Sequence, residues 1–203
     1  RLAHPQLRDA VGEATTKLEV EVDFPVAAGS LAALRWPRLE ELSIDCPDRV
    51  MTIEAAIEAL GSATWRALRS LRLNGLTGPD VSFNPDKADF DAPAARALAA
   101  ALRRMPALRA LDLECMVFSD AAAGELFCAS SAEAVPQLRA LTVFDAELTS
   151  TAVCVLAAAG WRLELLDLSD NANLGAAGLA ALLAAPTFAI RHLYLMSCGL
   201  DAA

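Results

Sequence analysis

The chain has 203 residues with 55% hydrophobic and only 5% aromatic side chains, so its core must be built from aliphatic residues. A formal net charge of −9 disfavours nucleic acid and anionic membranes as general partners and favours a basic protein. No apolar run approaches the roughly 20 residues that span a bilayer. The five widely spaced cysteines form neither a disulfide framework nor a C-x-x-C metal pair, which favours a reducing, cytoplasmic compartment.

The first 38 residues carry a weak pattern. Residues 1–14 show no clear periodicity. Leu18, Val20 and Val22 then alternate with Glu19 and Glu21, which predicts a half-buried strand. A helical segment around residues 31–34 follows and ends at Pro37. We interpret residues 15–38 as one repeat whose sequence pattern is weak.

From Leu39 onward, one pattern recurs in phase. Apolar residues occupy the first, fourth and sixth positions of a unit L-x-x-L-x-L-x-x-N, and a helical segment follows most copies. The spacings between successive first positions are 29, 40, 30, 25 and 27 residues. These first positions are Leu39, Leu68, Leu108, Leu138, Leu163 and Ile190.

Residues 163–183, LELLDLSDNANLGAAGLAALL, are the most complete copy. The pattern predicts a strand around Leu166, a turn at Asn171 whose side-chain amide bonds the backbone, and a helix from Gly175. Leu179, Leu182 and Leu183 are expected on one face of that helix. In the other copies the asparagine position holds a different residue.

Phrases such as PALRALDLECMVFSD and PQLRALTVFDAELTS resemble the leucine-rich-repeat family, in particular its long, ribonuclease-inhibitor-like subtype. The resemblance implies an α/β fold, a right-handed horseshoe solenoid with parallel strands on its concave face and helices on its convex face. It also implies a single domain over residues 1–203 with about six to seven repeats. The last repeat stops before its helix, so we expect further repeats or a cap beyond Ala203.

The long spacing between Leu68 and Leu108 predicts a loop insertion at about residues 77–92. Its prolines and aspartates indicate a solvated loop, and the aspartates raise the question of calcium. The EF-hand pattern is absent, and Asp91 followed by Pro93 is typical of a helix start, so no metal ligands are predicted. The aspartates considered are Asp80, Asp86, Asp89 and Asp91.

Solvent-facing strand positions supply the candidate binding residues. The second, third, fifth and seventh positions of each unit are expected to face outward, with an acidic centre and an exposed apolar end at Phe144, Tyr194 and Met196. Second-position arginines form an edge stripe that either binds a partner or makes cross-strand ion pairs. The candidates are Glu21, Asp45, Arg72, Asp112, Glu114, Phe144, Asp167, Tyr194 and Met196, and the stripe is Arg69, Arg109, Arg139 and Arg191.

Catalytic options are few. The only histidines are His4 and His192, and a pair of His192 with Cys198 has no evident orienting group, so we interpret Cys198 as a buried turn residue. No phosphate loop, zinc or serine-hydrolase motif is present.

We therefore predict a non-enzymatic protein-interaction module without cofactor or metal. Its acidic concave face would bind a basic protein or peptide, and its oligomeric state stays open. Charge reversal at Asp112 and Glu114 is expected to weaken that binding. Members of the family also serve as substrate-recognition arms of ubiquitin-ligase receptors or of innate-immune nucleotide-binding receptors, as activators of a small GTPase, or as scaffolds, and these alternatives remain.

Overall fold

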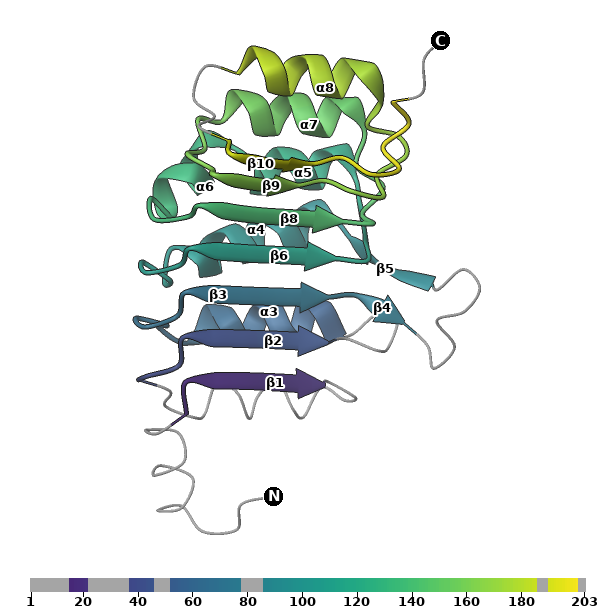
Figure 1. Ribbon diagram of the computed structural model, residues 1–203. Helices are drawn as coiled ribbons and strands as arrows, with labels where there is room; N and C mark the ends of the chain where they lie inside the picture. The colour runs from purple at the N-terminus through teal and green to yellow at the C-terminus, as the bar shows by residue number, and fades with distance from the viewer. Residues whose placement is uncertain (1–14, 22–36, 46–51, 78–85, 186–189, 201–203) are drawn as a thin grey trace, which may run out of the picture.

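The protein has an α/β fold with a parallel sheet and helices on one side of it (Figure 1). The computed structural model describes residues 15–21, 37–45, 52–77, 86–185 and 190–200. Seven strands form the main sheet, and each lies beside the next one along the chain in the order β1-β2-β3-β6-β8-β9-β10. The strands are β1 (Lys17–Glu21), β2 (Glu41–Asp45), β3 (Ser70–Asn74), β6 (Ala110–Glu114), β8 (Ala140–Phe144), β9 (Leu165–Asp167) and β10 (His192–Tyr194).

The strand register places equivalent positions of the sequence unit side by side. Leu71 pairs with Leu111, Leu111 with Leu141, and Leu141 with Leu166. The predicted alternation is therefore confirmed, because the fourth- and sixth-position side chains of β2 to β9 point into one core layer and are at most 2% exposed. The weakly spelled strand at Lys17–Glu21 also joins the sheet, in register with β2.

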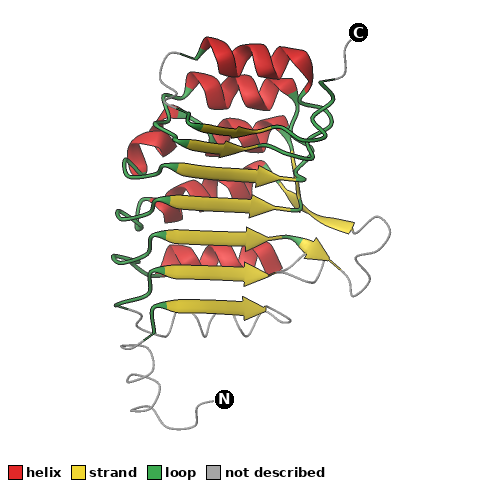
Figure 2. Cartoon of the chain, viewed as in Figure 1, coloured by secondary structure: helices red, strands yellow, loops and turns green. Residues whose placement is uncertain are grey.

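Helices cover one face of the sheet and leave the other open (Figure 2). Each packs on its neighbour in the sequence α3, α4, α5, α7, α8, and buried alanines such as Ala95 and Ala101 permit this close approach. Asp91, Ser119 and Thr149 cap helix N-termini by accepting from a backbone N–H. The helices are α3 (Thr52–Ser62), α4 (Ala92–Leu102), α5 (Asp120–Leu126), α6 (Ala129–Ala134), α7 (Ser150–Ala158) and α8 (Gly175–Ala184).

The apolar stripe of α8 differs from the predicted one. Leu182 is 4% exposed and Leu179 is half-buried, but Leu183 is 73% exposed. The buried stripe is instead Leu174, Gly178 and Leu182, at a spacing of four residues, and Gly178 lies close to the backbone of Ser150 in α7. Leu183 follows Leu182 by one position, which turns it about 100° away from α7.

The predicted loop insertion contains a strand, so that expectation is wrong for residues 86–90. β5 (Asp86–Phe90) pairs antiparallel with β4 (Leu76–Thr77) and parallel with β7 (Met116–Phe118), forming a second, three-stranded sheet. The physical reason is Phe90, which is 1% exposed and packs on Phe118 with ring centroids 4.5 Å apart.

The helix start predicted after the insertion is confirmed. The Asp91 carboxylate accepts from the backbone N–H of Ala94 at 2.9 Å, and Pro93 lies in the first turn of α4. Asp80 and the rest of residues 78–85 lie outside the described ranges, as do residues 1–14, the helix expected around 31–34, and residues 201–203. None of the described helices is long and apolar enough to cross a membrane.

Candidate functional site: the open face of the sheet

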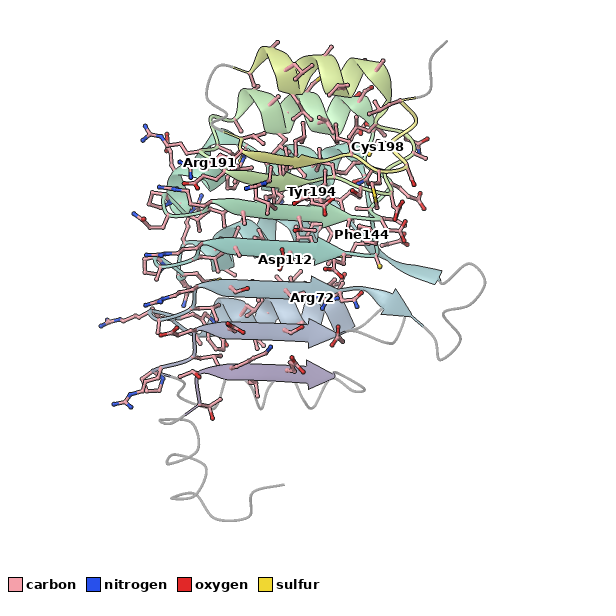
Figure 3. All side chains as sticks on the ribbon, viewed as in Figure 1. Arg72, Asp112, Phe144, Arg191, Tyr194 and Cys198 are labelled. Atoms are coloured by element: carbon pink, nitrogen blue, oxygen red, sulfur yellow. The ribbon has the colours of Figure 1, made fainter. Side chains whose placement is uncertain are left out.

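The open face of the main sheet carries the predicted binding residues in two rows (Figure 3). Because the strands are in register, fifth-position side chains form one row across the sheet and seventh-position side chains form the other. The side chain of Glu21 lies outside the described part. The fifth-position row is Glu19, Ser43, Arg72, Asp112, Thr142, Asp167 and Tyr194, and the seventh is Glu21, Asp45, Asn74, Glu114, Phe144, Ser169 and Met196.

Arg72 and Glu114 neutralise each other. A nitrogen of the Arg72 guanidinium donates to a carboxylate oxygen of Glu114 at 2.6 Å, between neighbouring strands β3 and β6. Both residues were predicted as separate contacts for a partner. Because their charges are already paired, a basic partner would have to displace Arg72 before it could use Glu114.

The surroundings of Asp112 shift the pKa of its carboxyl. Asp112 is half-buried, and burial raises the pKa of its carboxyl, while a hydrogen bond with Thr142 and the charge of Arg72 oppose that rise. The nearby Asp167 carboxylate raises the pKa of Asp112 further. The sequence places Thr142 at a solvent-facing fifth position in the strand between Asp112 and Asp167, but does not single it out as a binding residue.

The raised pKa of Asp112 predicts a pH dependence of stability. The folded protein keeps this proton to higher pH than the unfolded chain, so the contribution of Asp112 to stability falls as pH rises through a window that opens near its ordinary value of 3.8. The substitution Asp112→Asn retains an acceptor for Thr142 and removes the ionisation. We expect a higher melting temperature than wild type at neutral pH and no difference below the window. A variant less stable than wild type at neutral pH would contradict this.

The apolar end of the face is smaller than predicted. Tyr194 is 46% and Met196 is 69% exposed, but Phe144 is half-buried. The seventh-position row is also not uniformly outward, since Asn74 and Ser169 are buried. The hydroxyl of Ser169 accepts from the backbone N–H of Met196 at 3.2 Å, which uses this side chain within the sheet.

A shallow recess of about 140 Å³ lies at the β1 end of the open face. Lys17 there forms ion pairs with Glu19 at 3.3 Å and with Glu41 at 3.7 Å. The charges of this recess are thus largely satisfied internally. Asp45 lies in the seventh-position row beyond it and is half-buried.

The turn residues after the strands are structural. The Cys198 thiol is buried and donates to the backbone carbonyl of Leu168 at 3.0 Å, and burial raises the pKa of this thiol. An activated nucleophile requires the opposite shift. His192 lies exposed at the start of β10. Within the described ranges, no group of three or more His, Cys, Asp or Glu residues is placed to hold a metal ion.

The second-position arginines lie at the edge where the strands begin, and most of them are paired there. Arg69 lies 3.6 Å from Glu40, while Arg139 and Arg191 lie 3.9 Å and 3.5 Å from Glu164. The cross-strand interpretation therefore holds for three of the four. These exposed pairs contribute little stability each.

A scan against protein-family models finds no match, and a search of curated proteins finds no significant match.

Proposed function

We propose that the chain is a leucine-rich-repeat solenoid of the long, ribonuclease-inhibitor-like type, with the open sheet face on its concave side. In-register parallel strands in chain order support this, with a helix on one side of the sheet between each strand and the next from β2 to β10. Strands about 4.8 Å apart against helices about 8–10 Å apart bend such an array toward the sheet. A concave sheet face suits an extended or rounded protein partner.

We propose that this face binds a protein or peptide through a basic side chain held between Asp112 and Asp167. The observation that carries this is the fifth-position row over β6, β8, β9 and β10, where Asp112, Thr142, Asp167 and Tyr194 lie on consecutive strands. Two strand spacings separate the carboxylates, roughly 10 Å. A guanidinium or ammonium group above Thr142 can therefore approach both of them.

Tyr194 supplies the second half of such a site. It pairs in register with Asp167 and is 46% exposed, and Met196 beyond it is 69% exposed. An aromatic face beside two carboxylates favours a cation, and burying the tyrosine contributes apolar contact area. The non-enzymatic, cytoplasmic role of a binding module remains part of this proposal. A receptor's substrate-recognition arm would use the same face, whereas no described residue specifically favours GTPase activation.

A displayed random-peptide library selected on the immobilised protein tests the proposal. We expect enrichment of arginine and lysine, and about tenfold weaker binding of the best peptide to the double variant Asp112→Asn/Asp167→Asn. Glu114 is not the residue to change, because its loss releases Arg72 onto the face. Fluorescence anisotropy measures the affinities.

The matched control removes two charges elsewhere. Glu54 and Glu58 are exposed on α3, on the far side from the open face, so Glu54→Gln/Glu58→Gln changes the net charge equally. The control should bind as wild type does. Selected peptides without basic residues, or equal losses in the two double variants, would exclude the Asp112–Asp167 site.

A further inference from the structure

A basic rim runs along the edge where the strands of the main sheet begin. Nine of the eleven arginines within the described ranges lie in or just before the segments that lead into the strands. Arg69, Arg139 and Arg191 are paired with Glu40 or Glu164. The other six are exposed and form no ion pair within the described part of the chain: Arg38, Arg66, Arg103, Arg104, Arg109 and Arg162.

Parallel strands in chain order bring these arginines together. The backbone N–H of Arg109 donates to the carbonyl of Arg69 at 2.8 Å, and that of Arg139 donates to Arg109 at 2.9 Å, so these residues form a continuous ladder. The carbonyl of Arg104 accepts from the N–H of Trp65 at 2.9 Å, which joins the connections before β3 and β6. Successive arginines are thus spaced by about one strand separation, ~4.8 Å.

The molecule is polarised despite its net charge of −9. Figure 3 shows nitrogen-tipped side chains, Arg191 among them, at the edge where strands begin and oxygen-tipped side chains at the edge where they end. Asp145, Glu147 and Asp170 lie in the turns after β8 and β9. The net charge of the chain is therefore negative although the edge where the strands begin is positively charged.

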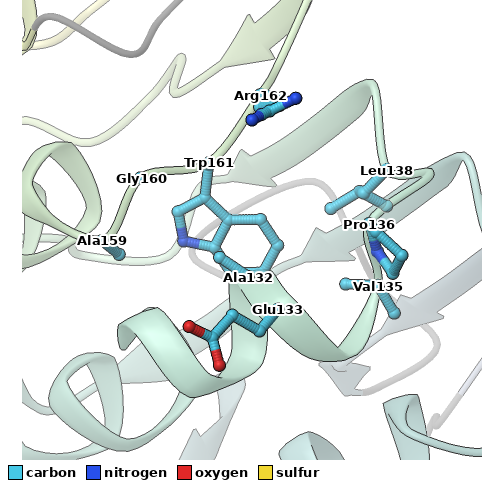
Figure 4. A pocket seen from close by; sticks show the side chains of 9 residues that line it. All are labelled: Ala132, Glu133, Val135, Pro136, Leu138, Ala159, Gly160, Trp161 and Arg162. Atoms are coloured by element: carbon cyan, nitrogen blue, oxygen red, sulfur yellow. The ribbon is translucent and has the colours of Figure 1, made fainter.

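A recess of about 550 Å³ opens on the same rim beside Arg162 (Figure 4). Its apolar part comes mainly from the exposed Pro136 and the half-buried Ala132 and Ala159, while the buried Val135, Leu138 and Trp161 reach the surface of the recess only slightly. The connection into β9 is short and turns at Gly160, whose φ of 79° is a conformation that glycine adopts readily. Glycine adds no side chain to the recess there.

Val135 and Trp161 set the size of this recess. Val135 stands three residues before Leu138, where the unit of Leu68 has the much larger Trp65. The Trp161 ring does not fill the recess. It is buried, and its indole N–H donates to the carbonyl of Phe127 at 3.3 Å. Volume of this size is typical of sites that accept a bulky group.

We propose that the basic rim binds an acidic protein segment that places one bulky apolar side chain in this recess. The unpaired arginines would contact carboxylates on either side of the seated residue, with Arg162 adjacent to it. Glu133 lies on the opposite wall of the recess and directs the acidic residues toward the arginine side.

A peptide fits this surface better than nucleic acid does. A long polyanion would extend over the acidic face and the opposite edge of a chain whose net charge is −9, and would be repelled there. The recess also lacks an open aromatic platform for a base, since Trp161 is only 2% exposed.

The test uses a fluorescein-labelled oligoglutamate peptide with one central phenylalanine. We expect saturable binding that weakens with salt, and a loss of about threefold for each of Arg104→Ala, Arg109→Ala and Arg162→Ala, about thirtyfold together. Replacing the phenylalanine by alanine should also weaken binding. Glu133→Gln should strengthen it. Arg96→Ala, on the outer side of α4, is the control with an equal charge change.

Three outcomes overturn the proposal. The first is an unchanged affinity of the triple variant, and the second is an equal loss in Arg96→Ala. The third is tighter binding of single-stranded oligothymidylate than of the peptide, which would make the rim a nucleic-acid surface. Circular dichroism of each variant verifies that the fold is retained. Arg96→Ala breaks an exposed ion pair with Glu125, and exposed pairs of this kind contribute little stability.

Discussion

Replacing Asn171 by alanine is expected to lower the free energy of unfolding by about 3–4 kcal/mol, which urea denaturation measures. The Asn171 side chain is fully buried. Its oxygen accepts from the backbone N–H groups of Ala146 and Leu148 at 3.1 and 2.9 Å. Its amide donates to the carbonyls of Val143 and Leu168 at 2.7 and 2.8 Å, and to that of Ser169. Alanine would leave these buried groups without partners.

Two other substitutions calibrate this loss. Asn173 is exposed two residues away, so Asn173→Ala should change stability by less than about 0.5 kcal/mol. The stability lost in Asn171→Cys should lie between the losses in the two alanine variants. Cys198, at the equivalent position of the next unit, donates to the carbonyl of Leu168, and this bond corresponds to the one from Asn171 to Val143. Equal stabilities of the two alanine variants would show that the turn after β9 does not depend on the Asn171 side chain.

Much of the fold could be predicted because one sequence unit recurs along the chain. The units that begin at Leu39, Leu68, Leu108, Leu138 and Leu163 each bury their first, fourth and sixth residues in one layer, so neighbouring strands from β2 to β9 repeat one pattern. The fifth and seventh positions then follow by alternation, and most of the predicted candidate residues on the open face lie together for this reason. The repetition carries information that a single short strand could not.

What could not be predicted depends on contacts between residues far apart in the sequence. Leu183 continues a leucine-rich helix, and only the position of α7 shows that its side chain faces away from the core. The pairing of Arg72 with Glu114 joins residues 42 positions apart on neighbouring strands. The net charge of the chain likewise gives no indication of the basic rim, which arises because the connections into parallel strands gather at one edge.

The two proposed surfaces are separate in space and opposite in sign. Asp112 and Asp167 lie within strands on the open face, whereas the unpaired arginines lie before the strands begin. A basic partner on the face and an acidic segment on the rim can therefore bind at the same time. Loss of either interaction in its own variants should leave the other intact, since the residues changed do not contact one another.

Phe118→Ala is expected to lower the free energy of unfolding by about 3–5 kcal/mol. Phe118 is 4% exposed and lies between two other rings, 4.5 Å from Phe90 and 5.8 Å from Phe127 between centroids. Phe90 belongs to β5, in the insertion that was expected to be a loop, and Phe118 belongs to β7. The three rings thus form an apolar contact between the small second sheet and the C-terminal end of α5.

The same deletion on the open face provides the control. Phe144→Ala removes an identical side chain from a half-buried site without a ring partner among the described residues, so about 1 kcal/mol is expected. Hydrogen exchange locates the damage, because Phe118→Ala should release the amides of residues 86–90 and 116–118 first, while β8 stays protected. If the two variants lost equal stability, or if protection fell uniformly, the aromatic cluster would not be what anchors the insertion.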